Sequence, residues 1–380
     1  MDYLDSPEEA EFRTRLRKWL ADSNVPDWRK ASSIEEARPL IRQWTSALND
    51  AGYLALTWPV AEGGQGLSPV YNMILNQEIG AAECPEYPGT INIFARMISI
   101  HGTDEQREKF LPATFNGDII WCQGFSEPDA GSDLANMSTS AVRHGDTWVV
   151  NGQKLWTTYA VYSDWCFLLA RTSSEGPKHR GISAFLVPLD TLGVQVRAVH
   201  LANDDPETGE VFWDNVEIPD KYMLGNPGDG WKIAMSTFTY ERNPAETHVM
   251  SELRAWLREA ERLAATHGVL DDPVIRRRLA DMYTRIEGLQ YVGLEQVSAR
   301  VKAAIAQPGE ESSVGKLLWT YAGQQLQHLI LDIVGARTVV DTRIDPMHDY
   351  VWSRVLSVLG GTAQIQKNIL AWRVLGLPRA

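Results

Sequence analysis

The spacing of hydrophobic residues indicates helices at the start of the chain. Ser6-Pro7-Glu8-Glu9 is a typical helix start, and Phe12, Leu16, Trp19 and Leu20 then recur at helical spacing, as expected for residues that face a core. Further helices are predicted at Pro39–Ala51, Ser68–Ala81, Asn92–His101 and Asp104–Leu111. We therefore expect an all-helical N-terminal domain over residues 1–119.

The middle of the chain changes to the alternating pattern of strands. Ala141–Arg143 and Trp148–Val150 lie on either side of the turn signal His144-Gly145-Asp146, and Asn151-Gly152 predicts a second hairpin turn. Further strands are predicted at Trp165–Arg171, Ile182–Val187, Val194–Val199 and Gly209–Phe212. This spacing of short strands is typical of a small β-barrel or sandwich, which we place at residues 120–231.

Helical periodicity returns in the last part of the chain. Long amphipathic segments are predicted at Glu252–Thr266, Asp272–Lys302 and Ser312–Leu331, and Asp272-Pro273 marks a clear helix start. We expect a C-terminal helical bundle over residues 232–380, and therefore an α+β protein of three domains.

Composition and charge narrow the possible partners. The chain is 44% hydrophobic and 22% charged, as in an ordinary globular protein, and its net charge of −13 argues against nucleic acid, which requires basic surfaces. No apolar run approaches membrane-spanning length, and the acidic amino terminus is not that of a signal peptide, so we expect a cytoplasmic protein. Cys84, Cys122 and Cys166 are widely spaced among apolar residues, which predicts buried free thiols and no metal site.

One loop in the strand-rich region is suited to an anion. After Ser126-Glu127-Pro128-Asp129 come Gly131, Ser132 and Asp133, and a glycine with short capping residues leaves backbone N–H groups available to a phosphate. Lys154–Thr158 then places an indole beside two hydroxyls. Such a loop and wall suit a flat, phosphate-bearing cofactor, although a β-domain with ordinary polar turns has the same local pattern.

These two segments resemble the signature of the acyl-CoA dehydrogenase family. The family pattern reads roughly (T/S)EPxAGSD followed by (I/V)NGxKxWIT(N/T), and Ser126–Asp133 and Asn151–Thr158 match it at the expected separation. The resemblance covers essentially the whole chain. It implies the acyl-CoA dehydrogenase fold, an α+β fold with an N-terminal helical domain, a middle β-barrel and a C-terminal helical bundle.

The resemblance also implies a reaction, a cofactor and partners. In the family, a carboxylate takes the α-proton of an acyl-CoA thioester while the β-hydrogen leaves as hydride to flavin N5 of FAD. The product is a trans-2-enoyl-CoA, and the electrons pass to an electron-transfer flavoprotein. The negative net charge does not exclude CoA, which requires only local cations.

The position of the catalytic base differs between branches of the family. The motif Gly361-Thr362-Ala363-Gln364-Ile365-Gln366 is intact, but Gly360 stands where many members carry the glutamate. In isovaleryl-CoA and long-chain dehydrogenases the glutamate lies on the first helix after the barrel, directly before an arginine, as Glu241 does before Arg242. The resemblance therefore assigns the base to Glu241. If Glu241 is instead a solvated helix residue, the chain is a catalytically silent subunit.

The cofactor contacts implied by the resemblance come from several segments. They are Gln123, Phe125, Ser126, Gly131, Ser132, Trp156, Thr158, Thr362 and Gln364. The first three should lie along the isoalloxazine, with Trp156 and Thr158 on its other side. Ser132 is expected at the FAD pyrophosphate or at the CoA, and Thr362 and Gln364 at the ADP portion.

On the substrate side the resemblance implies fewer contacts. Ser132 and Arg242 are expected to bind substrate, with Arg242 holding the CoA side or positioning the base. The backbone N–H of Gly360 is expected to polarise the thioester carbonyl, a role that glycine retains.

Two positions depart from the family pattern. The R-x-x-F-G-K segment, which sends an arginine to the FAD of a neighbouring subunit, has no clear match, and His267–Pro273 is shorter and acidic. Asp332 stands where the family usually has a glutamine that helps this arginine segment. With the ending Arg373–Arg379, these features resemble a bacterial branch that acts on dicarboxylyl- and steroid-side-chain-CoA, some of whose members form heteromers. The missing cation would come from Arg276, Arg277 or Arg278, or from another chain.

Several alternatives stay open at this point. The assembly is either a homo-oligomer or a heteromer with a related dehydrogenase chain. An oxidase or flavin monooxygenase on the same scaffold would differ in rapid reoxidation of its reduced flavin in air. A non-catalytic or half-site subunit would lack the bound yellow cofactor when purified alone.

Overall fold

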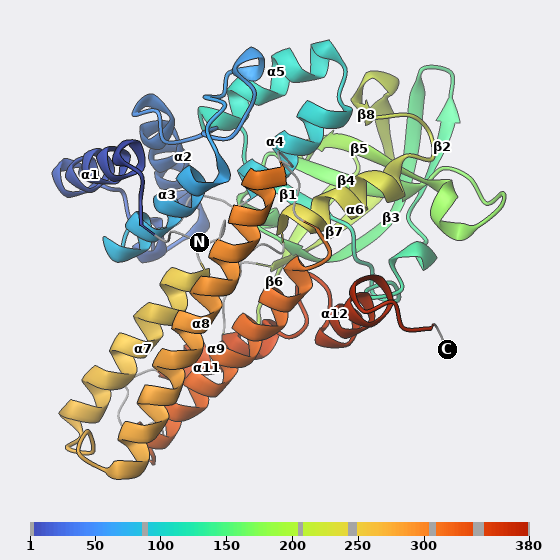
Figure 1. The fold of residues 1–380 in the computed structure, drawn as a ribbon. Helices are drawn as coiled ribbons and strands as arrows, with labels where there is room; N and C mark the ends of the chain where they lie inside the picture. The colour runs from blue at the N-terminus through green and yellow to red at the C-terminus, as the bar shows by residue number, and fades with distance from the viewer. Residues whose placement is uncertain are drawn as a thin grey trace. The chain divides into compact units, whose positions relative to one another are not determined.

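The computed structural model describes residues 4–85, 90–203, 208–241, 249–303, 309–336 and 346–378 (Figure 1). The chain divides into two compact units. The sheet unit comprises residues 24–67 and 85–238, and the helical unit comprises residues 1–23, 68–84 and 239–380. Both predicted domain boundaries, at 119/120 and 231/232, lie within the sheet unit, and the three-domain division stays a prediction.

An eight-stranded sheet forms the centre of the sheet unit (Figure 1). Its strands are β1 Trp121–Gly124, β2 Ser140–His144, β3 Thr147–Thr158, β4 Trp165–Arg171, β5 Ile182–Pro188, β6 Val194–Val199, β7 Thr208–Pro219 and β8 Met223–Leu224. Their order is β6-β7-β3-β2-β4-β5-β8, and β1 pairs with β4 in parallel. The long strand β3 is antiparallel to both β2 and β7, so neighbours on both sides support it.

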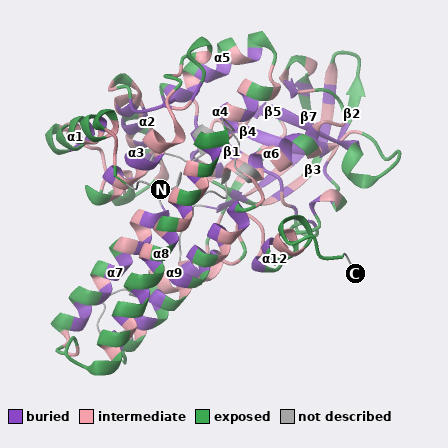
Figure 2. Ribbon diagram, in the orientation of Figure 1, coloured by how far each residue is buried: buried purple, intermediate pink, exposed green. Residues whose placement is uncertain are grey.

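Helices and short turns accompany the sheet. The helices are α2 Ile34–Asp50, α4 Thr90–His101, α5 Asp104–Phe115 and α6 Gly230–Glu241, and the 3-10 turns are η1 Trp28–Lys30, η2 Val60–Glu62, η3 Leu134–Asn136, η4 Ala160–Tyr162, η5 Lys178–Gly181 and η6 Asp220–Tyr222. Helix α4 packs against β1 and α5, and Phe94 of α4 stacks on Phe167 of β4 with 5.1 Å between ring centroids. The inner strands β4 and β5 are almost wholly buried (Figure 2).

The helical unit is built around helix α9. Its helices are α1 Pro7–Asp22, α3 Pro69–Ala81, α7 Val249–Thr266, α8 Pro273–Ala303, α9 Ser312–Val334, α11 Pro346–Val355 and α12 Ala363–Ile369, followed by a π-helical turn at Leu370–Val374. Helix α9 packs against α7, α8 and α11 (Figure 1). Apolar residues of these helices form a shared core, which includes Leu253, Ile286, Leu326 and Ile330.

Local signals placed most helices correctly. Ser6 caps α1 with a reciprocal bond to Glu9, and Asp272 caps α8 by accepting the Val274 N–H at 2.7 Å. The predicted start of α2 at Pro39 was wrong, because Ser33 caps the helix and Pro39 lies inside it.

The predicted hairpin turn at Asn151-Gly152 was also wrong, because both residues lie within β3. A β-bulge in β7 accommodates them: the register shifts between Val150 and Gly152, and Asn215 of β7 adopts a φ of +50°. Glycine is required at 152 because a Cβ there would lie 2.6 Å from the Thr139 Cα. The predicted hairpin at His144-Gly145-Asp146 is confirmed, with His144 opposite Thr147.

The cysteine prediction holds for two of the residues. Cys84, Cys122 and Cys166 are all free; Cys122 and Cys166 are buried opposite each other on β1 and β4, whereas Cys84 is only half-buried. Burial and the neighbouring Cys166 raise the pKa of Cys122 well above its ordinary value. None of the described helices combines the length and apolar character needed to cross a membrane.

Candidate functional site

The predicted site residues belong to both units. Gln123 to Thr158 lie in the sheet unit, and Glu241, Gly360, Thr362 and Gln364 lie in the helical unit. Glu241 is the last residue of α6. Its side chain and all of Arg242 lie outside the described residues, so their predicted roles stay predictions.

The end of β1 is anchored by an aromatic side chain. The Phe125 ring is 3% exposed and packs against Phe167 and Phe238, each with 5.8 Å between ring centroids. Gln123 and Ser126 on either side are half-buried, and the Ser126 carbonyl accepts the Leu155 N–H at 2.9 Å. The Phe125 ring therefore belongs to the core and fixes the course of its neighbours, while its predicted cofactor contact stays a prediction.

The loop after β1 presents an open backbone. Glu127 and Ala130 exchange two backbone hydrogen bonds of 3.1 Å, which fold the loop into a tight turn before η3. Gly131 and Ser132 beyond that turn are exposed, and apart from the adjoining residues no atom of the described chain lies within 4 Å of the position of a Cβ on Gly131. A ligand can therefore approach this backbone closely.

A buried ion pair lies behind the loop. The Lys154 side chain is fully buried, and its Nζ donates to Glu127 Oε1 at 2.8 Å and to the Phe125 carbonyl at 3.0 Å. Glu127, 4% exposed, also accepts the N–H and hydroxyl of Ser138 at 2.6 and 2.7 Å and the Thr139 N–H at 2.9 Å. Each charge is thus hydrogen-bonded as well as paired, as a buried charge requires.

The pKa values reflect this environment. Burial alone would raise the pKa of Glu127, but the Lys154 ammonium and the hydrogen bonds from Lys154, Thr139 and Ser138 outweigh it and lower the pKa to about 2. Burial lowers the pKa of Lys154, and Glu127 offsets this only in part.

Acid is expected to weaken the fold through Glu127. Because its folded-state pKa is about 2 and its ordinary value is 4.5, its stabilising contribution is complete above pH 4.5 and is lost as the pH falls towards 2. Urea titrations across this window measure the free energy of unfolding. In the double variant Lys154→Met/Glu127→Gln, this free energy should depend on pH less steeply than in the wild type, by at most about 1.4 kcal/mol per pH unit. An unchanged slope contradicts the prediction.

The end of β3 turns a large aromatic side chain outward. Between Lys154 and Thr157 the strand carries one more residue than its partner β7, which makes a β-bulge at Trp156. Trp156 has a φ of +62° and its side chain is 56% exposed. Thr158 is exposed as well, and buried Thr157 Oγ1 finds no hydrogen-bond partner within the described part of the chain. A strained, exposed indole at a bulge is typical of a binding site, and its exposure shows that the Trp156 side chain does not fill the core.

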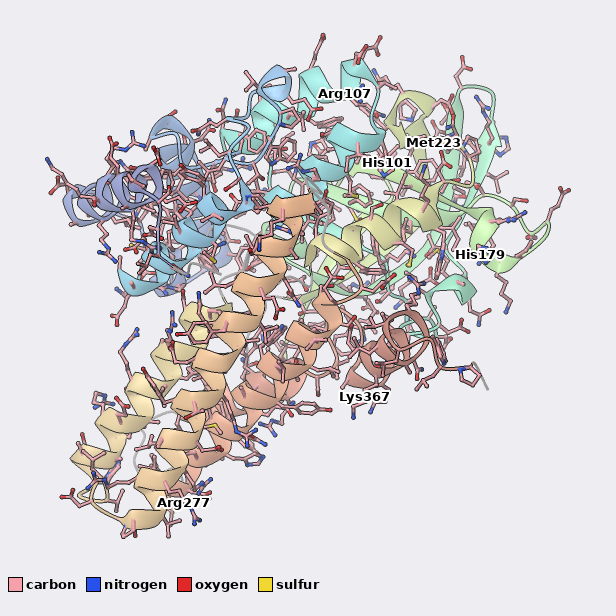
Figure 3. All side chains as sticks on the ribbon, viewed as in Figure 1. His101, Arg107, His179, Met223, Arg277 and Lys367 are labelled. Carbon is pink, nitrogen blue, oxygen red and sulfur yellow. The ribbon has the colours of Figure 1, made fainter. Side chains whose placement is uncertain are left out.

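In the helical unit, a tight glycine turn precedes α12. Gly360 and Gly361 have φ values of +61° and +93°, in the left-handed region that favours glycine. Thr362 caps α12 by accepting the Ile365 N–H at 3.2 Å. Gln364 is exposed on α12, as is Lys367 one turn later (Figure 3).

Three residues important to this geometry were missing from the predicted site. Gln366 is fully buried, and its Nε2 donates to the carbonyls of Gly360 and Gly361 at 3.0 and 3.3 Å, which holds the turn. Lys154 and Glu127 hold the loop after β1 through their ion pair and their bonds to Phe125, Ser138 and Thr139. All three lie inside the recognised motifs, and this was the only sequence signal that could have identified them.

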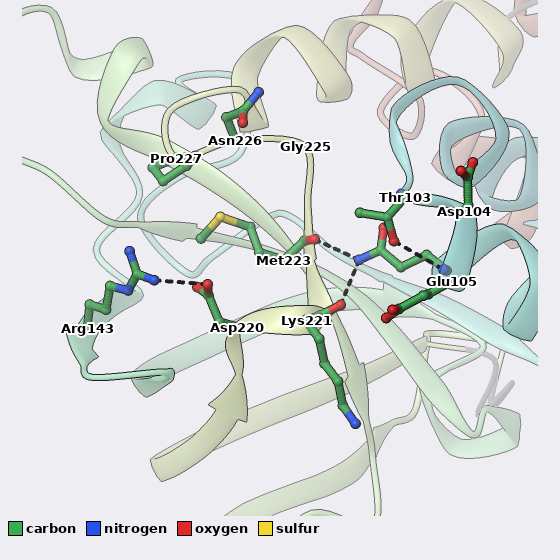
Figure 4. Close-up of a pocket in the computed structure, with 11 residues that line it drawn as sticks. Thr103, Asp104, Glu105, Arg143, Asp220, Lys221, Met223, Gly225, Asn226 and Pro227 are labelled. Carbon is green, nitrogen blue, oxygen red and sulfur yellow. Dashed lines mark hydrogen bonds and ion pairs between the residues drawn. The ribbon is translucent and has the colours of Figure 1, made fainter.

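A separate hollow of about 670 Å³ opens elsewhere on the sheet unit, near the start of α5 (Figure 4). Polar and apolar surface contribute about equally to its walls, and polar side chains there already have partners: Arg143 is paired with Asp220 at 2.9 Å, and Gln106 donates to the carbonyls of Lys221 and Met223, each at 2.8 Å. Among the predicted site residues that the structure describes, none lines it.

Comparison with known proteins defines the class of the protein. The chain matches the models of the acyl-CoA dehydrogenase N-terminal domain at residues 6–118, the middle domain at 122–216 and the C-terminal domain at 228–375. It is 37% identical to acyl-CoA dehydrogenase IpdE1 of Mycolicibacterium smegmatis, with 98% of both chains covered. These matches confirm the resemblance and the predicted fold class, and they identify an oxidoreductase that acts on acyl-CoA. The chain belongs to the acyl-CoA dehydrogenase family, whose members are flavoproteins.

Solved structures agree with this assignment. The chain is similar over the full length of both chains to one described as the ChsE4-ChsE5 complex from Mycobacterium tuberculosis, with a TM-score of 0.86 and 32% identity. It is similar to the same extent to the Tcur3481-Tcur3483 steroid ACAD, with a TM-score of 0.86 and 27% identity.

The residues of the sheet unit fit a flavin. An isoalloxazine requires a flat apolar wall with polar groups at its edge, and exposed Trp156 beside Thr158 supplies both. A pyrophosphate requires an accessible backbone with small residues, and Gly131 with Ser132 supplies it.

Proposed function

We propose that this chain is an FAD-dependent dehydrogenase that converts an acyl-CoA thioester into the trans-2-enoyl-CoA and passes the electrons to an electron-transfer flavoprotein. Two observations of the sheet unit carry the proposal together: the exposed, strained Trp156 on a bulge of β3 and the open loop at Gly131 and Ser132. When bound, FAD accepts the hydride from the substrate β-carbon.

The chain's own residues have distinct tasks in this reaction. Gln123, Phe125, Ser126, Trp156 and Thr158 hold and orient the isoalloxazine, and Gly131 and Ser132 bind phosphate. Thr362 and Gln364 bind the ADP portion. The left-handed turn at Gly360 presents its backbone to the thioester carbonyl, where a donated N–H stabilises developing enolate charge. Glu241 takes the α-proton, and Arg242 binds the CoA side or positions Glu241.

The proposed substrate class is a bulky or dicarboxylic acyl-CoA. Support comes from the similarity to a structure described as a steroid ACAD and from the departures at His267–Pro273 and Asp332. An anaerobic titration against a panel of acyl-CoAs tests the function and the class together, because substrate oxidation bleaches the flavin absorbance. A steroid-side-chain-CoA should bleach it at lower concentration than a straight-chain acyl-CoA. A chain that binds FAD but is bleached by no acyl-CoA overturns the proposed function.

A second candidate is a half-site subunit of a heteromeric dehydrogenase. It is favoured by the acidic connection between α7 and α8, which lacks the family's arginine, and by solved relatives whose descriptions name two different chains. Such a subunit would bind FAD only together with its partner.

Trp156→Ala is expected to weaken FAD retention and to shift the flavin absorbance bands, because it removes the apolar wall. Trp156→Phe, which keeps a ring, should have a smaller effect. Leu192→Ala, which truncates a 93% exposed apolar residue in the same unit, is the control and should leave both properties unchanged. Equilibrium dialysis and visible spectra measure the outcome; an unchanged spectrum and cofactor content in Trp156→Ala contradict the assignment.

A further inference from the structure

We propose that the buried Lys154–Glu127 ion pair is a positioning device for the cofactor pocket. It fixes the spacing of the three segments of the sheet unit assigned to the flavin, which are Gln123–Ser126, Gly131–Ser132 and Trp156–Thr158. The inference rests on the proposed function, since it is the proposed function that assigns these segments to the cofactor.

The ammonium joins the strand to the first segment. Lys154 lies on β3 two residues before Trp156, and its Nζ reaches the Phe125 carbonyl at 3.0 Å and Glu127 Oε1 at 2.8 Å. The next residue of the strand, Leu155, donates its N–H to the Ser126 carbonyl at 2.9 Å. Consecutive residues of β3 therefore hold consecutive residues of the segment after β1. A shift of one wall of the pocket displaces the other.

The carboxylate closes the loop that carries the second segment. Glu127 stands at the start of this loop, and its bonds to Ser138 and Thr139 fasten the loop's far end. Arg171 supports the same loop from β4, where its Nη2 donates to the Ala135 carbonyl at 2.6 Å and its Nε to the Met137 carbonyl at 3.1 Å. Gly131 and Ser132 thus project from a loop tied at both ends, which keeps an exposed backbone in one conformation.

The fold makes room for this pair. A Cβ on Gly124 would lie only 2.7 Å from Cys166 Sγ, so glycine allows β1 to pack closely on β4 beside the buried Lys154 stem. Two apolar residues of similar volume would stabilise such a core equally well or better, because burying two charges has a large desolvation cost. What apolar residues cannot supply is directional bonding to defined backbone atoms. The bulge at Trp156 is a second reason for an ion pair at this place, since a strained backbone persists only where its surroundings hold it.

The test separates positioning from stability by comparing variants. Lys154→Met removes the ammonium and leaves Glu127 buried, Lys154→Met/Glu127→Gln removes both charges, and Ser138→Ala removes a single hydroxyl bond to Glu127. The control is Glu78→Gln in the helical unit. Glu78 is 4% exposed and pairs with Arg13 and Arg17, each at 2.6 Å, so its loss also breaks a buried ion pair.

The measurements are the FAD dissociation constant, the flavin spectrum, kcat and KM for acyl-CoA, and the urea midpoint. Lys154→Met should raise the FAD dissociation constant about tenfold or more, shift the flavin bands and lower kcat more than it changes KM. The double variant should recover much of the urea midpoint without recovering the spectrum, and Ser138→Ala should lie between it and the wild type. Glu78→Gln should lower the urea midpoint while the FAD dissociation constant and spectrum stay as in the wild type.

Two results would overturn the inference in distinguishable ways. If the wild type binds FAD and the double variant and Ser138→Ala keep its affinity, spectrum and kcat, the pair serves stability alone and the proposed function stands. This comparison also decides the case in which Lys154→Met does not fold. If the wild type takes up no FAD, alone or with a co-expressed partner, the proposed function fails and the inference fails with it.

Discussion

Replacement of Glu241 by glutamine is expected to leave FAD bound while slowing acyl-CoA-driven flavin reduction by about 10²–10⁴-fold, the usual contribution of a general base. Glutamine keeps the size and shape of the side chain and removes its ability to accept the α-proton. The assignment depends on two features of the sequence: a glutamate directly before an arginine at the end of α6, and a glycine where other members of the family carry their base.

Stopped-flow mixing under anaerobic conditions measures this step directly. Glu252→Gln on α7 is a suitable control, because it removes a carboxylate from the same unit at a position without an assigned role. Near-normal flavin reduction by Glu241→Gln would rule out Glu241 as the base. Loss of FAD from the variant would instead indicate that Glu241 has a structural role.

Transfer of the base to position 360 is a more demanding version of the same test. Gly360→Glu in the Glu241→Gln background asks whether the alternative position faces the same carbon atom. The structure limits the expected recovery, because Gly360 has a φ of +61° and a glutamate in that conformation is strained. Partial recovery of reduction supports a shared site geometry, whereas complete recovery would show that the turn can relax.

Local signals in the sequence were sufficient for much of the fold. The hairpin between β2 and β3 was predicted from His144-Gly145-Asp146, and the starts of α1, α3 and α8 from Ser6, Ser68 and Asp272. In each case the residues that define the structure are neighbours in the chain. The prediction for Asn151-Gly152 failed because glycine is needed there for close packing against Thr139 and not for a turn. No local pattern in the sequence shows this contact.

The site was predictable to a lesser extent. The resemblance identified the loop at Ser126–Asp133 and the aromatic segment at Lys154–Thr158. The structure added that the Trp156 side chain is exposed on a strained bulge, whereas the Phe125 ring is buried. The importance of Lys154 and Glu127 was missed, because charged residues are ordinarily expected at the surface. Glu127 is held by bonds from Ser138 and Thr139, and Lys154 by its bonds to Glu127 and the Phe125 carbonyl, an arrangement that follows only from the folded chain.

The three arginines near the start of α8 are candidates for the cation that a bound FAD requires. Arg278 pairs with Asp332 at 2.8 Å, so each neutralises the other, and Arg276 lies 3.7 Å from Asp271. Arg277, exposed near the start of α8, forms no ion pair with any residue that the structure describes (Figure 3). Among the three arginines proposed as replacements for the family's missing cation, Arg277 is therefore the best candidate.

The chain expressed alone is expected to carry well under one FAD per protomer, and co-expression with a related dehydrogenase chain should restore full occupancy. The physical reason is that a pyrophosphate with two negative charges is costly to bury without a cation, even with helix N-termini and water nearby. This chain supplies the proposed wall and the proposed phosphate loop, whereas His267–Pro273 offers acidic residues where the family has an arginine. Flavin absorbance per protomer, with the mass of the assembly, measures the outcome.

Full and stable FAD occupancy in a homo-oligomer would reject the need for a second gene product. In that case Arg277 becomes the source of the cation, and Arg277→Ala should lower occupancy without changing the mass of the assembly. Arg285→Ala is the matched control, because Arg285 lies two turns further along α8 and is paired with Asp281 at 2.8 Å. Equal loss of FAD from both variants would point to helix stability instead of charge. If neither variant loses FAD, Arg277 is not the source of the cation.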